Sequence, residues 1–239
     1  MKKLAFVFLL SSVFCLTAQA QWGGVKGQGS VIEKNIQVPS FKGVKLAFSG
    51  NVVLKQGSTQ SVKVEGQENI IDLISTEVRD GIWKLKFTKN VRNYKKLNVY
   101  ITVPSLKYVG VSGSGNIKTE NNFTNLGDLE VKISGSGNIK FEGQAQSLKT
   151  SISGSGNMKL RGSANEVYVR ISGSGNINTS EVKTANCEVK ISGSGDAKVY
   201  ASDKLNVRVS GSGDVMYYGQ PKIKSKITGS GDLVAKSGS

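Results

Sequence analysis

Amide and carboxylate side chains recur at one position of a short repeated motif. Seven copies of Ser-Gly-Ser-Gly-Asn, or a close variant, begin at Ser112, Ser134, Ser153, Ser172, Ser192, Ser210 and Thr228. The fifth residue is Asn in four copies and Asp in three, at Asn116, Asn138, Asn157, Asn176, Asp196, Asp214 and Asp232. Stacked amides can hydrogen-bond along a ladder, and Asx side chains cap tight turns. Glycine-rich turns with Asp also suit calcium, but calcium takes about six to eight oxygen ligands, and one carboxylate per copy is sparse. The motif therefore favours a structural turn ladder over a metal site.

Basic side chains recur two residues before most of the motifs. Five of these six equivalent positions are basic, at Lys132, Arg170, Lys190, Arg208 and Lys226. They are the candidate ligand-binding residues, and a similar row follows the motifs at Lys118, Lys140, Lys159 and Lys198. With a net charge of +15, the chain favours an anionic polysaccharide, lipopolysaccharide or another envelope component as partner, and nucleic acid less so. The alternative is that the charge only keeps a strand-rich surface soluble, partly neutralised by Glu130 and Glu188.

The sequence lacks the residue combinations of the common catalytic sites. The sequence contains no His, which excludes Ser-His-Asp and Cys-His arrangements and the commonest metal ligand. Polysaccharide lyases with a β-helical fold cluster Asp, Lys and Arg on extended loops, whereas the charges of this chain repeat evenly on short coils. We therefore predict that the protein is not an enzyme and needs no cofactor.

The motif spacing predicts the elements that hold these side chains. Successive copies start 18 to 22 residues apart, and alternating apolar residues such as Leu129, Val131 and Ile133 precede them. This period is typical of a solenoid, in which each coil buries its apolar side against its neighbours. We predict an all-β fold, a right-handed parallel β-helix with 18–22 residues per coil, in one domain over residues 31–235. Residues 31–110 would form irregular opening coils, with a short helix at 68–74 and a tight turn at Asp80-Gly81, and residues 111–235 the regular coils.

The N-terminal residues indicate export. Residues 1–20 have the charged start, apolar stretch and Ala-Gln-Ala cleavage pattern of a signal peptide. Residues 21–30 form a Gly-rich leader in which we expect no packed element. Export leads to the periplasm, the outer membrane or the cell exterior, and no later stretch is long enough for a transmembrane helix. Cleavage leaves Cys187 as the only cysteine, and its place in an alternating strand predicts a buried thiol. An oligomer is possible because a solenoid has sheet edges at its ends.

The repeats also resemble a known family. Gly-Ser-Gly-Asn-Ile at 113–117, 135–139 and 173–177, Phe-Lys-Gly-Val at 41–44 and Leu-Asn-Val-Tyr-Ile-Thr-Val-Pro-Ser-Leu at 97–106 are similar to the putative auto-transporter adhesin, head GIN domain family. The resemblance covers about residues 31–235 and implies a β-helical fold in an exported protein of Bacteroidetes-type bacteria, without a catalytic motif. We therefore expect an exported, adhesin-like module of the cell envelope that presents repetitive basic faces to polyanionic or glycan ligands. The alternatives are a structural envelope protein without a specific ligand and a calcium-dependent carbohydrate-binding or lytic protein.

Overall fold

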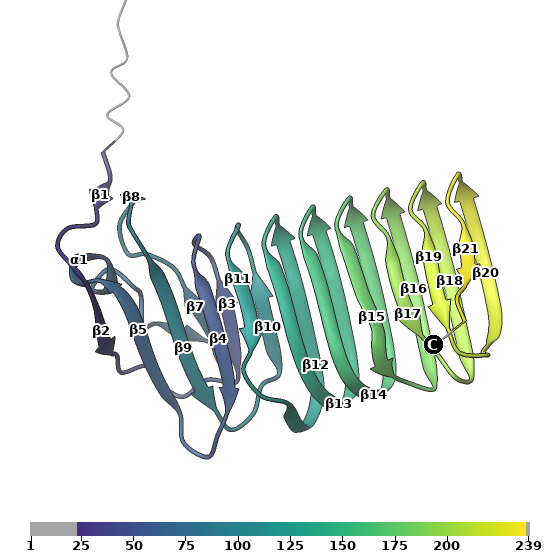
Figure 1. Ribbon diagram of the computed structural model, residues 1–239, viewed down its shortest axis with the longest axis horizontal. Helices are drawn as coiled ribbons and strands as arrows, with labels where there is room; N and C mark the ends of the chain where they lie inside the picture. The colour runs from purple at the N-terminus through teal and green to yellow at the C-terminus, as the bar shows by residue number, and fades with distance from the viewer. Residues whose placement is uncertain (1–22, 238–239) are drawn as a thin grey trace, which may run out of the picture.

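The chain folds as a β-solenoid of about seven turns built from stacked parallel strands. The computed structural model describes residues 23–237, so the predicted signal peptide lies outside the described residues. Figure 1 shows the strands of successive coils side by side along the long axis, from purple N-terminal coils to the yellow last coil. The all-β solenoid that the motif spacing predicted is thereby confirmed.

Strands that lead into the motifs form one face of the solenoid, which we call the first face. Leu129 pairs with Leu148 and Leu148 with Val167, so equivalent residues of successive coils lie in register at the predicted spacing. The strands of this face are β10 (Tyr108–Val111), the C-terminal parts of β12 (Phe123–Gly135), β13 (Asn138–Gly154) and β14 (Asn157–Gly173), then β16 (Asn186–Gly193), β18 (Lys204–Gly211) and β20 (Lys222–Gly229).

Strands that follow the motifs form the second face. They are β4 (Asn51–Gln56), β9 (Leu97–Val103), β11 (Asn116–Thr119), the N-terminal parts of β13 and β14, then β15 (Asn176–Lys183), β17 (Ala197–Tyr200), β19 (Val215–Tyr218) and β21 (Leu233–Ala235). Because side chains of a strand alternate between its two sides, both faces point one set of residues into the core and the other outward.

The core is a continuous stack of aliphatic side chains. Val131, Ile133, Ile152, Val169 and Ile171 are all at most 2% exposed, and burial of such a side chain contributes roughly 1.5–3 kcal/mol. The same stack contains Cys187, which is 2% exposed, and burial raises the pKa of its thiol to about 12. The predicted buried thiol is thereby confirmed.

From the second motif on, the two glycines of a motif lie close to the backbone of the previous coil. Gly154 has a φ of 136°, and a Cβ atom there would lie 2.4 Å from the carbonyl oxygen of Gly135. A Cβ atom on Gly156 would lie 2.3 Å from the carbonyl oxygen of Gly137. The Gly135 carbonyl also accepts hydrogen bonds from the backbone N–H groups of Ser155 (3.0 Å) and Gly156 (3.1 Å). Positive φ and contact with the previous coil therefore both require glycine at the corner.

The first coils do not stack in the order of the sequence. Strand β3 (Gly43–Leu46) lies between β7 (Ile82–Leu85) and β10, and β4 likewise lies between β9 and β11. Counted along the solenoid from its N-terminal end, the first coil contains β7 and β9, the second β3 and β4, and the third β10 and β11 (Figure 1). The second coil therefore comes before the first in the sequence. The apolar pattern specifies which side chains point inward but not which strands become neighbours, so this order was not predicted.

An antiparallel cap covers the N-terminal end. Strand β5 (Ser61–Gln67) pairs antiparallel with β9, and β2 (Val31–Asn35) pairs antiparallel with β5. The helix α1 (Glu68–Ile71) forms within the predicted helical segment. The predicted turn joins β6 (Val78–Arg79) to β7, where Asp80 and Gly81 have φ values of 51° and 71°. The expectation of no packed element in the leader is wrong for β1 (Val25–Lys26), because this segment pairs with β8 (Val91–Asn93).

The C-terminal end carries no comparable cap among the described residues. Strands β20 and β21 each pair with one neighbouring strand only, and Ile223 and Val234 are 43% and 37% exposed. Lys222, Lys224 and Lys226 lie along β20, and charged edge residues of this kind oppose pairing with another sheet. Over residues 23–237, none of the helices has the length and apolar character to cross a membrane.

Candidate functional site

An asparagine ladder runs along the second face at the first residue of its strands. In successive coils the Nδ2 atom of each amide donates to the Oδ1 atom of the previous one. The distances are 2.9 Å from Asn138 to Asn116, 3.3 Å from Asn157 to Asn138 and 3.2 Å from Asn176 to Asn157. An amide has two N–H donors and two acceptor lone pairs. Each rung within the ladder therefore keeps one donor and one acceptor position available to solvent or a ligand.

Aspartates continue the ladder with a different hydrogen bond. The backbone N–H of Asp196 donates to Oδ1 of Asn176 (3.0 Å), that of Asp214 to Oδ1 of Asp196 (2.9 Å), and that of Asp232 to Oδ1 of Asp214 (2.8 Å). In the asparagine coils the corresponding backbone N–H instead donates to a glycine carbonyl, as Asn157 does to Gly137. A carboxylate has no N–H to donate, so the backbone supplies the donor, and this charge-assisted bond offsets repulsion between stacked carboxylates.

The geometry of the aspartates is that of a turn ladder. Within the described part of the chain, no three His, Cys, Asp or Glu side chains gather in an arrangement that could hold a metal ion.

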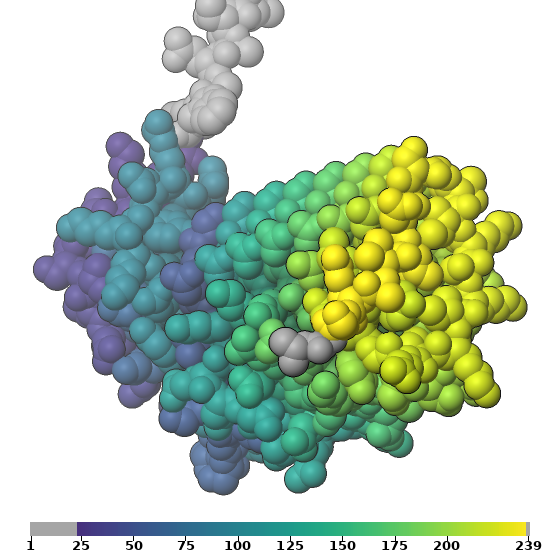
Figure 2. Space-filling view, turned by 45° about the vertical axis from the view of Figure 1, so that its right-hand side comes forward, coloured from purple at the N-terminus to yellow at the C-terminus, as the bar shows by residue number. Residues whose placement is uncertain are grey.

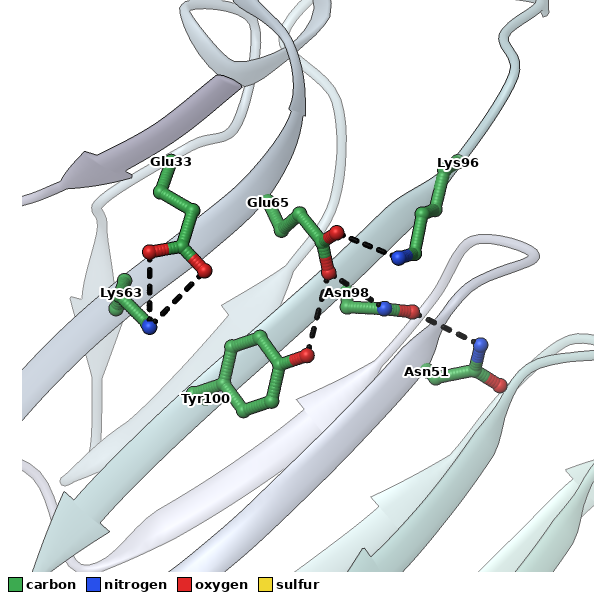
Figure 3. Close-up of polar contacts among 7 residues, drawn as sticks. All are labelled: Glu33, Asn51, Lys63, Glu65, Lys96, Asn98 and Tyr100. Carbon is green, nitrogen blue, oxygen red and sulfur yellow. Dashed lines mark hydrogen bonds and ion pairs between the residues drawn. The ribbon is translucent and has the colours of Figure 1, made fainter. Parts of the chain in front are cut away.

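The ladder extends beyond the predicted residues and ends on a carboxylate (Figure 3). Asn116 donates to Asn51 (3.1 Å), Asn51 to Asn98 (3.0 Å), and Asn98 to Oε2 of Glu65 (2.9 Å). All amides thus direct an N–H toward the same end, where the negative carboxylate stabilises the aligned dipoles. Asn98 and Glu65 were not predicted because neither lies in a Ser-Gly motif, although Asn98 precedes an inward valine as Asn51 does.

Several donors converge on the carboxylate of Glu65. Lys96 Nζ lies 2.5 Å from Oε1, and Tyr100 Oη lies 3.2 Å from Oε2 (Figure 3). The hydrogen bond from Lys96, followed by that from Asn98, holds the pKa of Glu65 below its ordinary value. The cluster therefore keeps this end of the ladder ionised and fixed.

The basic residues predicted on the first face lie in one column. The sheet register places equivalent residues of successive coils beside one another, in the order Lys132, Ser151, Arg170, Lys190, Arg208 and Lys226. Ser151 is the one residue of these six that is not basic. We call the five basic residues the basic column. It continues toward the N-terminus through Gly110 to Lys45 and Lys84. Figure 2 shows the coils stacked along the long axis of the solenoid, from purple at the N-terminal end to yellow at the C-terminal end.

Most charges of the basic column have no carboxylate partner. Lys190 Nζ lies 2.5 Å from Oε1 of Glu188, as the sequence spacing suggested. The other four members take part in none of the ion pairs formed among residues 23–237. Predicted neutralisation of Lys132 by Glu130 does not occur as an ion pair, so Lys132, Arg170, Arg208 and Lys226 present unpaired positive charge.

A groove of about 1340 Å³ follows the second face, and the asparagine ladder lines it. The next outward position carries a lysine in four coils, and we call these residues the lysine row: Lys118, Lys140, Lys159 and Lys198, with Asn178 between the last two. Val53 and Tyr100 continue this position beyond Lys118, and Met216 continues it beyond Lys198. Lys159 pairs with Glu181 at 2.8 Å. The other three lysines form no ion pair with any described residue. The groove therefore offers amides and ammonium groups in parallel rows.

The chemical groups of these surfaces are suited to noncovalent contacts. They supply hydrogen-bond donors, acceptors and fixed positive charge in rows, and the sequence has no His to serve as a base. The one thiol of the described residues, Cys187, is buried and protonated. The fold and the site thus define a repetitive β-solenoid that presents rows of amide and basic side chains.

Comparison with known proteins assigns the family. Residues 40–221 match the putative auto-transporter adhesin, head GIN domain family, and the chain belongs to it. A crystal structure of a putative adhesin from Bacteroides fragilis is 27% identical, with a TM-score of 0.81 over 89% of this chain and 100% of that chain. No curated protein matches the sequence.

Two further crystal structures share the fold at lower identity. A putative lipid binding protein from Parabacteroides distasonis is 22% identical, with a TM-score of 0.75 over 90% of this chain and 100% of that chain. A putative adhesin from Parabacteroides merdae is 22% identical, with a TM-score of 0.76 over 89% of this chain and 99% of that chain. The family resemblance noted in the sequence is thereby confirmed.

Proposed function

We propose that the chain is a non-catalytic, exported module of the cell envelope that binds polyanionic ligands through its basic column. The observation that carries this proposal is the alignment of four unpaired basic side chains, Lys132, Arg170, Arg208 and Lys226, in one column of the first face. Membership of an adhesin family and the signal-like residues 1–20 support export and an external partner. The periplasm, the outer membrane and the cell exterior are all compatible compartments.

Repetition makes weak contacts effective. Neighbouring strands of a sheet lie about 4.8 Å apart, so a flexible polyanion can place a negative group near each basic side chain in turn. One exposed ion pair contributes only about 0.2–1 kcal/mol, but contacts made by one polymer along a rigid column combine into higher overall avidity. The net charge of +15 also attracts polyanions from a distance, and this attraction weakens as salt is added.

The test is charge reversal along the basic column. A variant with the five substitutions Lys132→Glu, Arg170→Glu, Lys190→Glu, Arg208→Glu and Lys226→Glu should keep its melting temperature and lose salt-sensitive retention on immobilised acidic polysaccharides. A matched control reverses five exposed residues away from the column, at Lys26, Lys42, Lys89, Arg92 and Lys107. Both variants carry the same net charge. Equal retention of the two variants would show that overall charge, and not the column, accounts for binding.

A further inference from the structure

We propose that the groove of the second face is a separate site for one strand of a linear acidic polysaccharide. The strand lies along the solenoid axis, with carboxylates against the lysine row and hydroxyls against the asparagine ladder. The inference rests on the proposed function only in taking a polyanion as the ligand. The groove lies on the second face, whereas the basic column lies on the first face. It assigns a ligand class and an orientation to the groove.

The asparagine ladder makes the groove selective for hydroxyl groups. Each amide uses one N–H and one lone pair within the ladder, so each rung can donate one hydrogen bond and accept another. A sugar hydroxyl also donates and accepts, whereas a carboxylate or phosphate only accepts. The rungs repeat at the strand spacing of about 4.8 Å, which is close to the length of one sugar unit in an extended chain.

The lysine row supplies the complementary charge. The groove is lined by the four lysines of the row and by two carboxylates, Glu120 and Asp196. Glu120 is already paired with Lys55 at 2.7 Å, and Asp196 accepts the backbone N–H of Asp214 at 2.9 Å. Lys118, Lys140 and Lys198 thus remain as unpaired charges, and the groove as a whole attracts an anionic chain.

The N-terminal end of the groove sets a limit for that chain. Tyr100 lines this end and donates to Glu65, while Lys63 Nζ lies 5.1 Å from the centre of the tyrosine ring (Figure 3). Lys63 in turn pairs with Glu33 at 3.0 Å (Figure 3). Glu33 and Glu65 already pair with Lys63 and Lys96, so this end offers an anionic strand no unpaired lysine of its own. The bound segment therefore lies over the coils from Asn116 toward Met216.

The lining also favours sugar over nucleic acid and lipid. Proteins that bind single-stranded nucleic acids stack successive bases on aromatic side chains, and Tyr100 is the one aromatic residue that lines the groove. Among the described residues, the large apolar side chains that are exposed lie outside the groove; they are Val31, Ile32, Tyr168, Ile223 and Val234. Val53 and Met216, which line it, are half-buried. Neutral amides beside ammonium groups are therefore matched best by a polymer that carries both hydroxyls and carboxylates.

The experiment compares two charge-matched variants by calorimetric titration with oligogalacturonate of defined length. The groove variant carries Lys118→Gln, Lys140→Gln and Lys198→Gln, and the matched variant carries Lys26→Gln, Lys42→Gln and Lys107→Gln, at exposed positions outside both the groove and the basic column. All six side chains lie outside the ion pairs of the described residues, so both variants should melt as the wild type does. We expect the groove variant to bind oligogalacturonate about tenfold more weakly, and the matched variant to lose much less.

Three further probes separate charge from hydroxyl recognition. They are a polyglutamate peptide of equal charge, the same oligosaccharide with its carboxyl groups reduced, and single-stranded DNA. The wild type should prefer oligogalacturonate to all three, and the groove variant should lose its preference over polyglutamate. Equal losses by the two variants, or equal wild-type affinity for oligogalacturonate and either charged probe, would overturn the inference. If a third variant with Lys132→Gln, Arg170→Gln and Arg208→Gln keeps full affinity for polyglutamate, the function proposed for the basic column fails while the groove assignment stands.

Discussion

Removal of one rung should measure what the asparagine ladder contributes to stability. Asn138 donates to Asn116 at 2.9 Å and accepts from Asn157 at 3.3 Å, so Asn138→Ala removes two hydrogen bonds. A hydrogen bond contributes about 0.5–1.5 kcal/mol net. Because the ladder lies at the surface, water can bind the released groups, and we expect the lower part of this range for each bond. The free energy of unfolding should therefore fall by about 1–2 kcal/mol.

The expected change in melting temperature is small but measurable. For a domain of this size 1 kcal/mol corresponds to about 2–4 °C in melting temperature, so Asn138→Ala should lower it by about 2–8 °C. Asn176→Asp should cost about half as much, because it removes the donor to Asn157 and keeps the acceptor for Asp196. Lys140→Ala, an outward neighbour of Asn138 without an ion pair, is the control and should change stability by less than about 0.5 kcal/mol.

The order of the three variants decides whether the reasoning holds. Differential scanning calorimetry and urea unfolding should both rank the loss as Asn138→Ala, then Asn176→Asp, then Lys140→Ala. If Asn138→Ala unfolds with the same free energy as Lys140→Ala, the ladder hydrogen bonds contribute nothing beyond those that water would provide. If Asn176→Asp is the most destabilised, repulsion among stacked carboxylates outweighs the backbone bonds that we assign to them.

Further predictions concern the corner, the cap and the thiol. Gly154→Ala should destabilise by more than about 3 kcal/mol, because a positive φ and a contact with the Gly135 carbonyl oxygen coincide there; a urea midpoint equal to the wild type's would refute this. The pKa of Glu65 is lowered chiefly by the hydrogen bond from Lys96. Its contribution to folding stability is therefore complete above its ordinary pKa and is lost as the pH falls through its lower pKa in the folded protein. Wild type should accordingly lose more stability than Glu65→Gln on acidification, and parallel pH curves would contradict the assignment. Cys187, with a pKa of about 12, should react with a thiol reagent only as fast as the chain unfolds, whereas rapid labelling of the native protein would show that the thiol is accessible.

The regular coils could be predicted because two signals repeat together in the sequence. The glycine corner fixes where each strand begins, and the alternation of apolar residues fixes which side chains point inward, as with Leu129, Leu148 and Val167. Those two facts determine the register, and the register places Lys132 and its equivalents in one column. Periodicity is thus sufficient where every coil contacts only its neighbours.

The N-terminal part could not be predicted from the same signals. Strand β3 has the alternation of any coil, and nothing in its sequence states that β7 will lie on one side of it and β10 on the other. The antiparallel pairing of β5 with β9 and the contact of β1 with β8 depend on long-range partners in the same way. The last rungs of the ladder, Asn98 and Glu65, were missed for this reason, because they join it only through that rearranged stacking.

The ladder and the lysine row make different demands on a ligand. The amides of Asn138 and Asn157 are already held by their hydrogen bonds, so a ligand that uses their free donors and acceptors loses little side-chain entropy on binding. Lys118 and Lys140 are exposed and have no ion-pair partner among the described residues. Ordering each side chain costs about 0.5–1.5 kcal/mol. It follows that the lysines contribute mainly to attraction and salt dependence, whereas the ladder distinguishes one polyanion from another. Selectivity should therefore persist at salt concentrations that weaken overall affinity.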